Sequence, residues 1–295
     1  RSSDLSSGRE AGRRQIEQSF RDLQTERIDL IQVHNLQDTE TQLRQLRELS
    51  GEQFQAIRAD DLSAVGPGEV VTVMGPSGSG KSTLLSALTG ELRASQGSVE
   101  VFGRALPQRQ RDLLETRKSI GVLLQGNGLL TDLTAAENVA LPLRMHTKLP
   151  APVIARLVEM KLHAVGLRAA ADLYPRELSG GMARRVALAR ALALDPPLMI
   201  YDEPLTGLDP IASGVIMALI ARLNASLGLT SIIVTHHVHE TLPVADRALV
   251  IADGSIVFSG TPDQLQQTTD PLVRQFLDGR PDGPIAFDAP QREVA

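Results

Sequence analysis

Short apolar runs alternate with helical stripes over most of this chain. The runs predict buried strands in VVTVM (70–74), LMIYDE (198–203), SIIVTH (231–236) and ALVIADG (248–254). Helical patterns separate them at 82–92, 180–194 and 212–227. Because continuous apolar strands alternate here with helices, we expect an α/β fold with a parallel sheet that is covered by helices on both faces.

Two segments depart from this alternation. Residues 128–178 lack a strand pattern and 149–167 look helical, which predicts a helical subdomain over roughly residues 126–180. The C-terminal segment 278–295 is rich in Pro and Gly, so we expect it to be extended.

Composition narrows the class of protein without identifying it. The 295 residues carry a net charge of −5, with 42% hydrophobic and 22% charged residues, which is typical of a globular protein and gives no general attraction to nucleic acid. The absence of cysteine excludes disulfides and thiolate zinc sites. No apolar run approaches the ~20 residues that a bilayer span needs. The first residues, RSSDLSSGREAGRR, lack the apolar core of a signal peptide.

The sequence GPSGSGKS (75–82) lies between the first strand and a helix, and it fits the pattern G-x-x-x-x-G-K-[ST]. Its glycines allow backbone N–H groups to surround phosphate oxygens, and a helix N-terminus favours the anion. Lys81 can reach the β- and γ-phosphates, and the Ser82 hydroxyl can bind Mg²⁺. A chance Gly-rich turn is the alternative, but the flanking strand and helix favour a P-loop that binds ATP and Mg²⁺.

Two acids end the strand LMIYDE (198–203). In a P-loop fold, Asp202 at such a strand end is suited to the Mg²⁺ shell. Glu203 is suited to orient or deprotonate the attacking water. Two acids by themselves are as well explained as a solvated pair, but together with GPSGSGKS they indicate nucleotide hydrolysis.

The run LSGGMARR (178–185) opens a helix with Ser, Gly and Gly. It can therefore present N–H groups and the Ser179 hydroxyl to a second phosphate site. With the two motifs above, it resembles the signature of ABC-transporter nucleotide-binding subunits. The resemblance covers roughly residues 61–288 and implies a P-loop NTPase with a RecA-like sheet and a helical ABC-type subdomain. It also implies a homodimer, in which ATP lies between GPSGSGKS of one subunit and LSGGM of the other.

The resemblance implies roles for three further positions. Gln125 matches the loop residue that contacts Mg²⁺ and water and faces the transmembrane partner, and Asp209 in GLDP matches a residue at the dimer interface. His236 matches the switch histidine that contacts the γ-phosphate and positions Glu203. The expected catalytic residues are Glu203, His236 and Gln125, and the expected Mg²⁺ ligands are Ser82, Gln125 and Asp202. The expected nucleotide-binding residues are Gly75, Pro76, Ser77, Gly78, Ser79, Gly80, Lys81, Ser82, Thr83, Ser179, Gly180, Gly181 and Asp209.

Three histidines crowd VTHHVHE (234–240), which raises the alternative of a metal site. Such a site needs ligands that converge, and we expect the side chains of His237 and His239 to diverge just past a strand end. We therefore interpret His236 as the γ-phosphate contact and His239 as a solvated residue at a helix start. His237 stands where the resembled family usually has Asp.

Within the family, three stretches resemble the ATPases of the Mla phospholipid-transport systems of Gram-negative bacteria: 129–144, 178–210 and 270–287. This resemblance implies a cytoplasmic protein, peripheral on the inner membrane, that energises phospholipid transport between the inner and outer membranes. The implied partners are permease subunits (MlaE-like), a periplasmic lipid-binding subunit reached through the permease (MlaD-like) and a STAS-type regulator (MlaB-like), with no nucleic acid.

Residues 12–49 do not match the antiparallel β-region that begins ABC cassettes. Part of them, 20–49, resembles a strand and flanking helices of an aldo/keto reductase barrel, but too little chain is present to close a barrel. We therefore divide the chain into an inactive reductase-like fragment (1–50), an ABC ATPase domain (51–260) and a C-terminal helix and tail (261–295). With an atypical β-region, we expect weakened nucleotide affinity.

Other functions stay open at this point. The chain could be the ATPase of another transporter of the same branch, a soluble ABC protein of DNA repair or translation, or a chimera that has lost turnover. Soluble ABC proteins usually carry a coiled-coil insertion or two cassettes, and this chain has one cassette. ATP turnover that vanishes in a Glu203→Gln variant would separate the enzyme from an inactive module.

Overall fold

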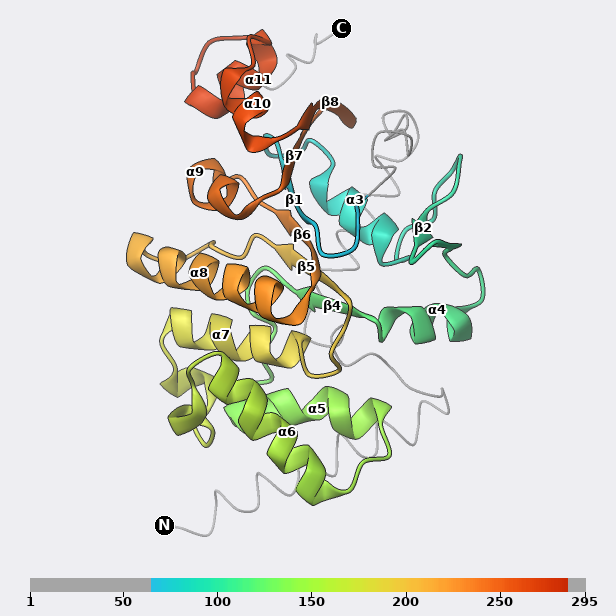
Figure 1. Cartoon of the computed structure of the whole chain (residues 1–295), viewed down its shortest axis with the longest axis vertical. Helices are drawn as coiled ribbons and strands as arrows, with labels where there is room; N and C mark the ends of the chain where they lie inside the picture. The colour runs from blue at the N-terminus through green and yellow to red at the C-terminus, as the bar shows by residue number, and fades with distance from the viewer. Residues whose placement is uncertain (1–64, 286–295) are drawn as a thin grey trace, which may run out of the picture. The chain divides into compact units, whose positions relative to one another are not determined.

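A six-stranded sheet with the order β4-β5-β6-β1-β7-β8 forms the centre of the described chain (Figure 1). The computed structural model describes residues 65–285, so the reductase-like fragment at 1–50 lies outside the described residues. The strands are β1 Val70–Met74, β4 Ile120–Leu123, β5 Leu198–Asp202, β6 Thr230–Val234, β7 Arg247–Ala252 and β8 Ser255–Gly260. Within this sheet all pairings are parallel except that of β8 with β7. The predicted α/β class with a parallel sheet is confirmed, apart from this antiparallel edge.

Successive residues of each central strand face opposite layers of helices. Met199 and Tyr201 of β5 pack into one core with α7 (Gly180–Ala191) and α8 (Pro210–Leu227). Their neighbours in β5 pack into a second core with α3 (Lys81–Leu88). Side chains alternate between the faces of a strand, so a run of apolar residues fills both cores. Figure 1 shows α8 and α3 on opposite sides of the sheet.

Helix α8 is, within residues 65–285, the one helix whose length and apolarity would suffice to cross a membrane. In the fold it is a core helix, since Ile216, Ile220 and Leu223 pack against the sheet with at most 6% of their surface exposed.

A helical layer, α5 (Ala135–His146) and α6 (Ala151–Ala164), follows β4 and packs on α7. Thr134 and Glu137 form a capping box that starts α5. The buried Asn138 amide donates to the carbonyls of Leu130, Leu133 and Thr134, which fixes the loop that enters this layer. The 3₁₀ turns Arg168–Ala170 and Pro175–Glu177 then lead to the start of α7.

The remaining elements are short. They are β2 Glu100–Val101, β3 Arg104–Ala105, α4 Gln110–Arg117, α9 Val238–Thr241, the 3₁₀ turn Leu242–Val244, α10 Pro262–Gln267 and α11 Pro271–Asp278. Leu265 and Val273 bury α10 and α11 against β7. Beyond α11 the described residues to 285 form neither helix nor strand. The Gln275 side chain donates to the Ile285 carbonyl and accepts from its N–H, which ties this segment down.

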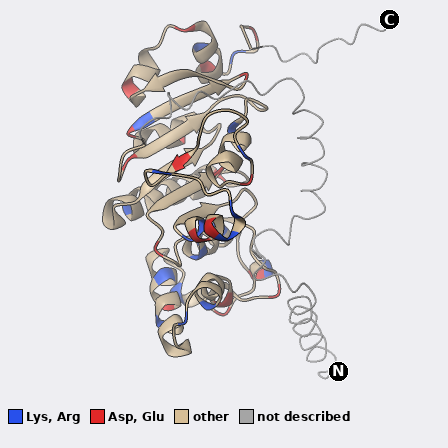
Figure 2. Ribbon diagram, turned by 90° about the vertical axis from the view of Figure 1, so that its right-hand side faces the viewer, with Lys and Arg blue, Asp and Glu red and all other residues tan. Residues whose placement is uncertain are grey.

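Charged residues of both signs are interspersed over the described part of the chain (Figure 2). This distribution agrees with the small net charge of −5.

Candidate functional site

The P-loop, residues 75–82, connects β1 to α3 and lies against the turn between β7 and β8. Gly75, Gly78 and Gly80 have φ values of 149°, 80° and 105°, which side chains rarely allow. A Cβ on Gly75 would lie 2.1 Å from the Ile251 carbonyl oxygen. The Gly254 N–H also donates to the Ser79 carbonyl over 3.1 Å. The glycines are therefore required by both the curvature of the loop and its close packing.

The donors of this loop suit a polyphosphate. Helix α3 begins at Gly80 without a side-chain cap, which leaves N–H groups of its first turn available to an anion. The buried Ser79 hydroxyl has no hydrogen-bond partner among the described residues. The Lys81 ammonium donates to the Gly75 and Pro76 carbonyls, each over 2.8 Å, and so lies along the loop. Ser82, at the first turn of α3, is exposed and open to a cation.

Opposite charges meet at the carboxyl end of β5. Burial lowers the pKa of Lys81, and the neighbouring Glu203 and Asp202 partly offset this effect. Burial, together with the charge of Glu203, raises the pKa of Asp202 to about 6, against the opposing effects of Lys81 and Arg184. Asp202 is therefore a half-buried carboxylate whose charged form a bound cation would stabilise, as expected of a Mg²⁺ ligand.

Glu203 is held rigidly just after β5. Its backbone has a φ of 46°, and its N–H donates to the Val234 carbonyl of β6 over 2.8 Å. His236 Nδ1 lies 2.9 Å from Glu203 Oε1, and the buried Thr235 hydroxyl donates to Oε2 over 3.4 Å. A carboxylate that is buried and oriented in this way can position a water and accept its proton. The structure thus brings Glu203 and His236 together.

The signature residues and Asp209 form a second group at two helix starts. The Ser179 hydroxyl accepts the Met182 N–H over 3.2 Å and caps α7. The Asp209 carboxylate accepts from the N–H groups of Ile211 and Ala212 and caps α8. A Cβ placed on Gly181 would lie 3.6 Å from Ala212, so the two helix starts adjoin. Ser179, Gly180 and Asp209 are all exposed.

Two buried arginines, to which the sequence motifs assigned no role, hold the loop around Gln125. Arg184 of α7 donates to the Leu124 carbonyl over 2.9 Å and to the Thr206 carbonyl over 3.2 Å. Arg190 of α7 donates to the carbonyls of Gly128 and Asn127 over 2.6 and 3.0 Å. Burial lowers the pKa of Arg190 to about 10. Helix α7 therefore links the signature motif at its start to the exposed Gln125.

The expectation that His237 would diverge from its neighbours is wrong. The His236 and His237 ring centroids lie 4.3 Å apart, and ligand atoms of both rings and of Glu203 all lie within 4.8 Å of one another. The His237 N–H donates to the Thr235 hydroxyl over 2.9 Å, which turns the chain back toward Glu203. His239 is exposed and does not belong to this group.

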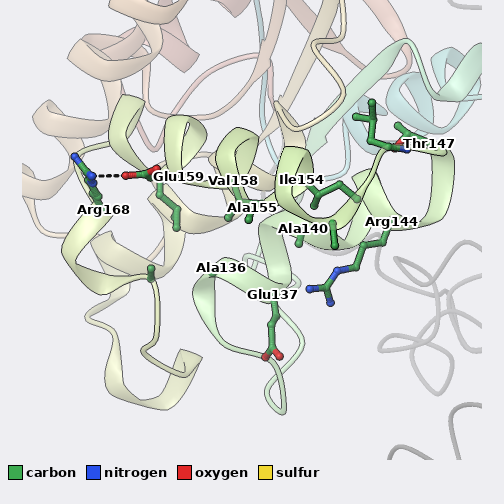
Figure 3. A pocket seen from close by; sticks show the side chains of 14 residues that line it. Ala136, Glu137, Ala140, Arg144, Thr147, Ile154, Ala155, Val158, Glu159 and Arg168 are labelled. Atoms are coloured by element: carbon green, nitrogen blue, oxygen red, sulfur yellow. Dashed lines mark hydrogen bonds and ion pairs between the residues drawn. The ribbon is translucent and has the colours of Figure 1, made fainter.

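A groove of about 550 Å³ lies between α5 and α6, away from the phosphate motifs (Figure 3). Ala140, Ile154 and Val158 line its apolar floor, and Glu159 pairs with Arg168 at one end. None of the expected nucleotide-binding residues contributes to it, so the groove suits a protein surface better than a nucleotide.

Asp202→Asn is expected to stabilise the chain above pH 6 when nucleotide and Mg²⁺ are removed. The pKa of Asp202 rises from its ordinary 3.8 to about 6 on folding, so between these values the folded protein keeps a proton that the unfolded chain has lost. The free energy of unfolding should therefore fall as pH rises through this window, by about 1–3 kcal/mol in all. The Asn side chain does not ionise, so the variant should not lose this part of its free energy of unfolding. Urea unfolding in EDTA from pH 4 to pH 8 measures the difference, and equal pH slopes in both proteins would contradict it.

Comparison with known proteins identifies the family and several relatives of this chain. Residues 60–206 match the family described as ABC transporter. The chain is 52% identical over 227 residues to the intermembrane phospholipid transport system ATP-binding protein MlaF of Haemophilus influenzae, which covers 77% of this chain and 86% of that protein. It is 50% identical over 233 residues to MlaF of Escherichia coli K12, with 78% and 87% covered.

More distant similarities extend to other cassettes. The "Probable ribonucleotide transport ATP-binding protein mkl" of Mycobacterium leprae is 40% identical over 227 residues, which span 77% of this chain and 65% of that protein. A dimeric post-hydrolysis structure of the ATP-binding cassette MJ0796 with ADP and Pi superposes with a TM-score of 0.62 and 32% identity, covering 68% of this chain and 88% of that one. CbiO1 of Clostridium perfringens, part of the ABC transporter complex CbiONQ, gives a TM-score of 0.65 with 30% identity, covering 72% and 84%.

Proposed function

This chain belongs to the ABC transporter family as an ATP-binding subunit that hydrolyses ATP, and on that premise we propose that it energises phospholipid transport between the inner and outer membranes. The observation that carries this proposal is the 52% identity to MlaF of Haemophilus influenzae, over 86% of that protein. The identity to the mkl protein is lower, at 40%, so a phospholipid is the preferred substrate class.

In the proposed site, the P-loop would hold ATP, and Ser82, Asp202 and Gln125 would hold Mg²⁺. Bound Mg²⁺ would draw charge from the phosphate oxygens that Lys81 and the N-terminus of α3 also face. Glu203 orients a water and accepts its proton, because its carboxylate is buried and fixed by two hydrogen bonds. His236 holds Glu203 on one side and, being exposed, is free to contact the γ-phosphate on the other.

The chain is proposed to act as a homodimer. One subunit would contribute the P-loop and Glu203 to an ATP site. The other subunit would contribute the helix starts at Ser179 and Asp209, so that each group forms half of the site. Ile211, in the first turn of α8 two residues after Asp209, is 82% exposed, and Val215 on the same face is 49% exposed. Apolar side chains so open to water beside a phosphate-binding helix start favour a partner subunit there.

Ile211→Glu is expected to weaken ATP-dependent dimerisation without unfolding the subunit. The side chain lies in solvent, so its replacement should change the free energy of unfolding by less than about 0.5 kcal/mol. Two added carboxylates would face each other or the Asp209 region across a symmetric interface. Sedimentation of the variant with ATP, in a Glu203→Gln background that slows turnover, should report monomers where the parent forms dimers. Equal dimer fractions would count against this interface.

The membrane partners are proposed to be MlaE-like permease subunits, with an MlaD-like periplasmic subunit bound through them and an MlaB-like regulator on the cytoplasmic side. The protein would then be peripheral on the cytoplasmic face of the inner membrane. Leu149, which lines the α5–α6 groove, is 40% exposed, and Val153 and Met160, outside the groove lining on α6, are 43% and 56% exposed. These exposed apolar side chains support the helical layer as the surface that receives one of these partners.

Co-purification of the tagged full chain from solubilised Gram-negative membranes tests the proposal. Mass spectrometry should identify a permease of the Mla type together with the lipid-binding and STAS-type proteins. Ala155→Arg places a charge in the exposed part of the groove and should lower the yield of a partner, whereas Ala169→Arg, exposed but outside the groove lining, should not. Recovery of a different permease, or of DNA-repair or translation proteins in its place, would overturn the phospholipid assignment.

A further inference from the structure

The convergence of two imidazoles on Glu203 is not needed for ATP hydrolysis. His236 Nδ1 lies 2.9 Å from Glu203 Oε1, and His237 contributes a third ligand atom within 4.8 Å of the other two. The assigned roles use Glu203 and His236 and leave His237 without a function.

We propose that Glu203, His236 and His237 form an inhibitory site for a transition-metal ion of the Zn²⁺ class. This inference rests on the proposed function insofar as the metal would occupy Glu203 and His236, the residues assigned to water activation and to the γ-phosphate. Zn²⁺ typically takes three protein ligands and leaves a fourth position open, and two His with one Glu is a known set of this kind.

The backbone around the three ligands is fixed before any metal arrives. The Glu203 N–H bond to the Val234 carbonyl fixes the backbone that carries the carboxylate, and the His237 N–H bond to the Thr235 hydroxyl fixes the backbone that carries the second ring. The Thr241 hydroxyl donates to the His237 carbonyl over 2.7 Å, which holds the turn from the other side. Rotation of the two rings about their side-chain bonds is the main adjustment needed. Loss of entropy on metal binding is therefore small.

The ligand types distinguish this site from the proposed Mg²⁺ site. Imidazole nitrogens favour Zn²⁺, Cu²⁺ and Ni²⁺, whereas Mg²⁺ favours oxygen ligands such as those of Asp202 and Ser82. The His236 side chain is 57% exposed while Glu203 is 12% exposed, so an ion can enter from solvent and reach the carboxylate. On binding, metal–ligand bonds would replace the His236–Glu203 hydrogen bond, and both groups would be withdrawn from catalysis.

Calorimetric titration of the full chain with Zn²⁺, free of Mg²⁺ and nucleotide, tests the site directly. The parent should bind one Zn²⁺ that His237→Asn binds at least about tenfold more weakly, because loss of a ligand costs no less than loss of a group that only supports one. His239→Asn, two residues away and exposed, is the matched control and should bind as the parent does. Circular dichroism confirms that each variant is folded. Equal Zn²⁺ affinity of the parent and His237→Asn would overturn the proposal.

A second measurement separates this inference from the proposed function. ATP turnover of each protein, expressed as a fraction of its own rate without Zn²⁺, should fall at about tenfold lower Zn²⁺ in the parent than in His237→Asn. Inhibition that does not depend on His237 would contradict the inhibitory role. A parent without turnover in the absence of Zn²⁺ would refute the catalytic assignment, and the calorimetric titration would still decide whether the metal site exists.

Discussion

Glu203→Gln is expected to lower ATP turnover by about 10²–10⁴-fold, the range that loss of a positioned general base gives. Gln keeps the size of the side chain and can still bond to His236 and Thr235, so the local structure should persist. It cannot accept a proton from water. ATP binding depends on the P-loop, which this change does not touch, so the affinity for nucleotide should stay close to that of the parent.

Phosphate release and binding of a fluorescent ATP analogue, measured on the same preparations, test this expectation. Glu240→Gln, a change of the same kind in the exposed segment after His239, is the matched control and should retain the parental rate. A Glu203→Gln protein that hydrolyses ATP at the parental rate would remove Glu203 from the catalytic assignment. Loss of ATP binding together with turnover would instead point to a structural role.

Arg190→Met is expected to impair both stability and turnover. The change leaves the Gly128 and Asn127 carbonyls without their donor, while it relieves the burial of a charged group. We expect the net loss in the free energy of unfolding to be about 1–3 kcal/mol, because unpaired buried carbonyls are costly. Asn127 has a φ of 68° and follows Gly126 at 82°, so the loop is poorly placed to hold its shape alone. Misplacement of the adjacent Gln125 can lower turnover by up to about 10²-fold.

Urea unfolding and ATP turnover measured side by side test the role of Arg190. Arg222→Met is the control, since Arg222 is exposed and donates to the single carbonyl of Ala164 over 3.1 Å. It should leave both quantities nearly unchanged. Arg190→Met could instead unfold at the same urea concentration as the parent and hydrolyse ATP at the parental rate. The contact between α7 and the Gln125 loop would then contribute to neither stability nor turnover.

The parts of the site that the sequence could predict are local. GPSGSGKS follows β1 directly, and its glycine positions coincide with the positive φ values that the loop needs. Asp202 ends β5, and Ser179 and Asp209 precede helices that their side chains cap. In each case the chemistry depends on neighbours within a few positions, so a short stretch of sequence contains it. Assignment of their roles in catalysis stays a prediction.

The parts that the sequence did not reveal depend on contacts between distant segments. β4 is four residues long and contains Gly121, and β8 pairs antiparallel at the sheet edge with alternating exposure. Neither has the long apolar run by which the central strands were recognised. Arg184 and Arg190 resemble the surface arginines of any helix in sequence, and only the packing of α7 on the Gln125 loop buries them. The direction of the His237 side chain was predicted wrongly for a related reason. A turn held by the bond from the His237 N–H to the Thr235 hydroxyl brings this side chain back toward β5.

The most direct test of the account is ATP-driven phospholipid movement. The complex purified through this chain is reconstituted into liposomes that contain a fluorescent phospholipid, and transfer to its lipid-binding subunit is followed with ATP and Mg²⁺. We predict that phospholipid transfer requires ATP. In the complex that carries Glu203→Gln, phospholipid transfer should change together with the loss of ATP turnover. ATP hydrolysis by an intact complex with no change in phospholipid transfer, in either direction, would contradict the proposed function.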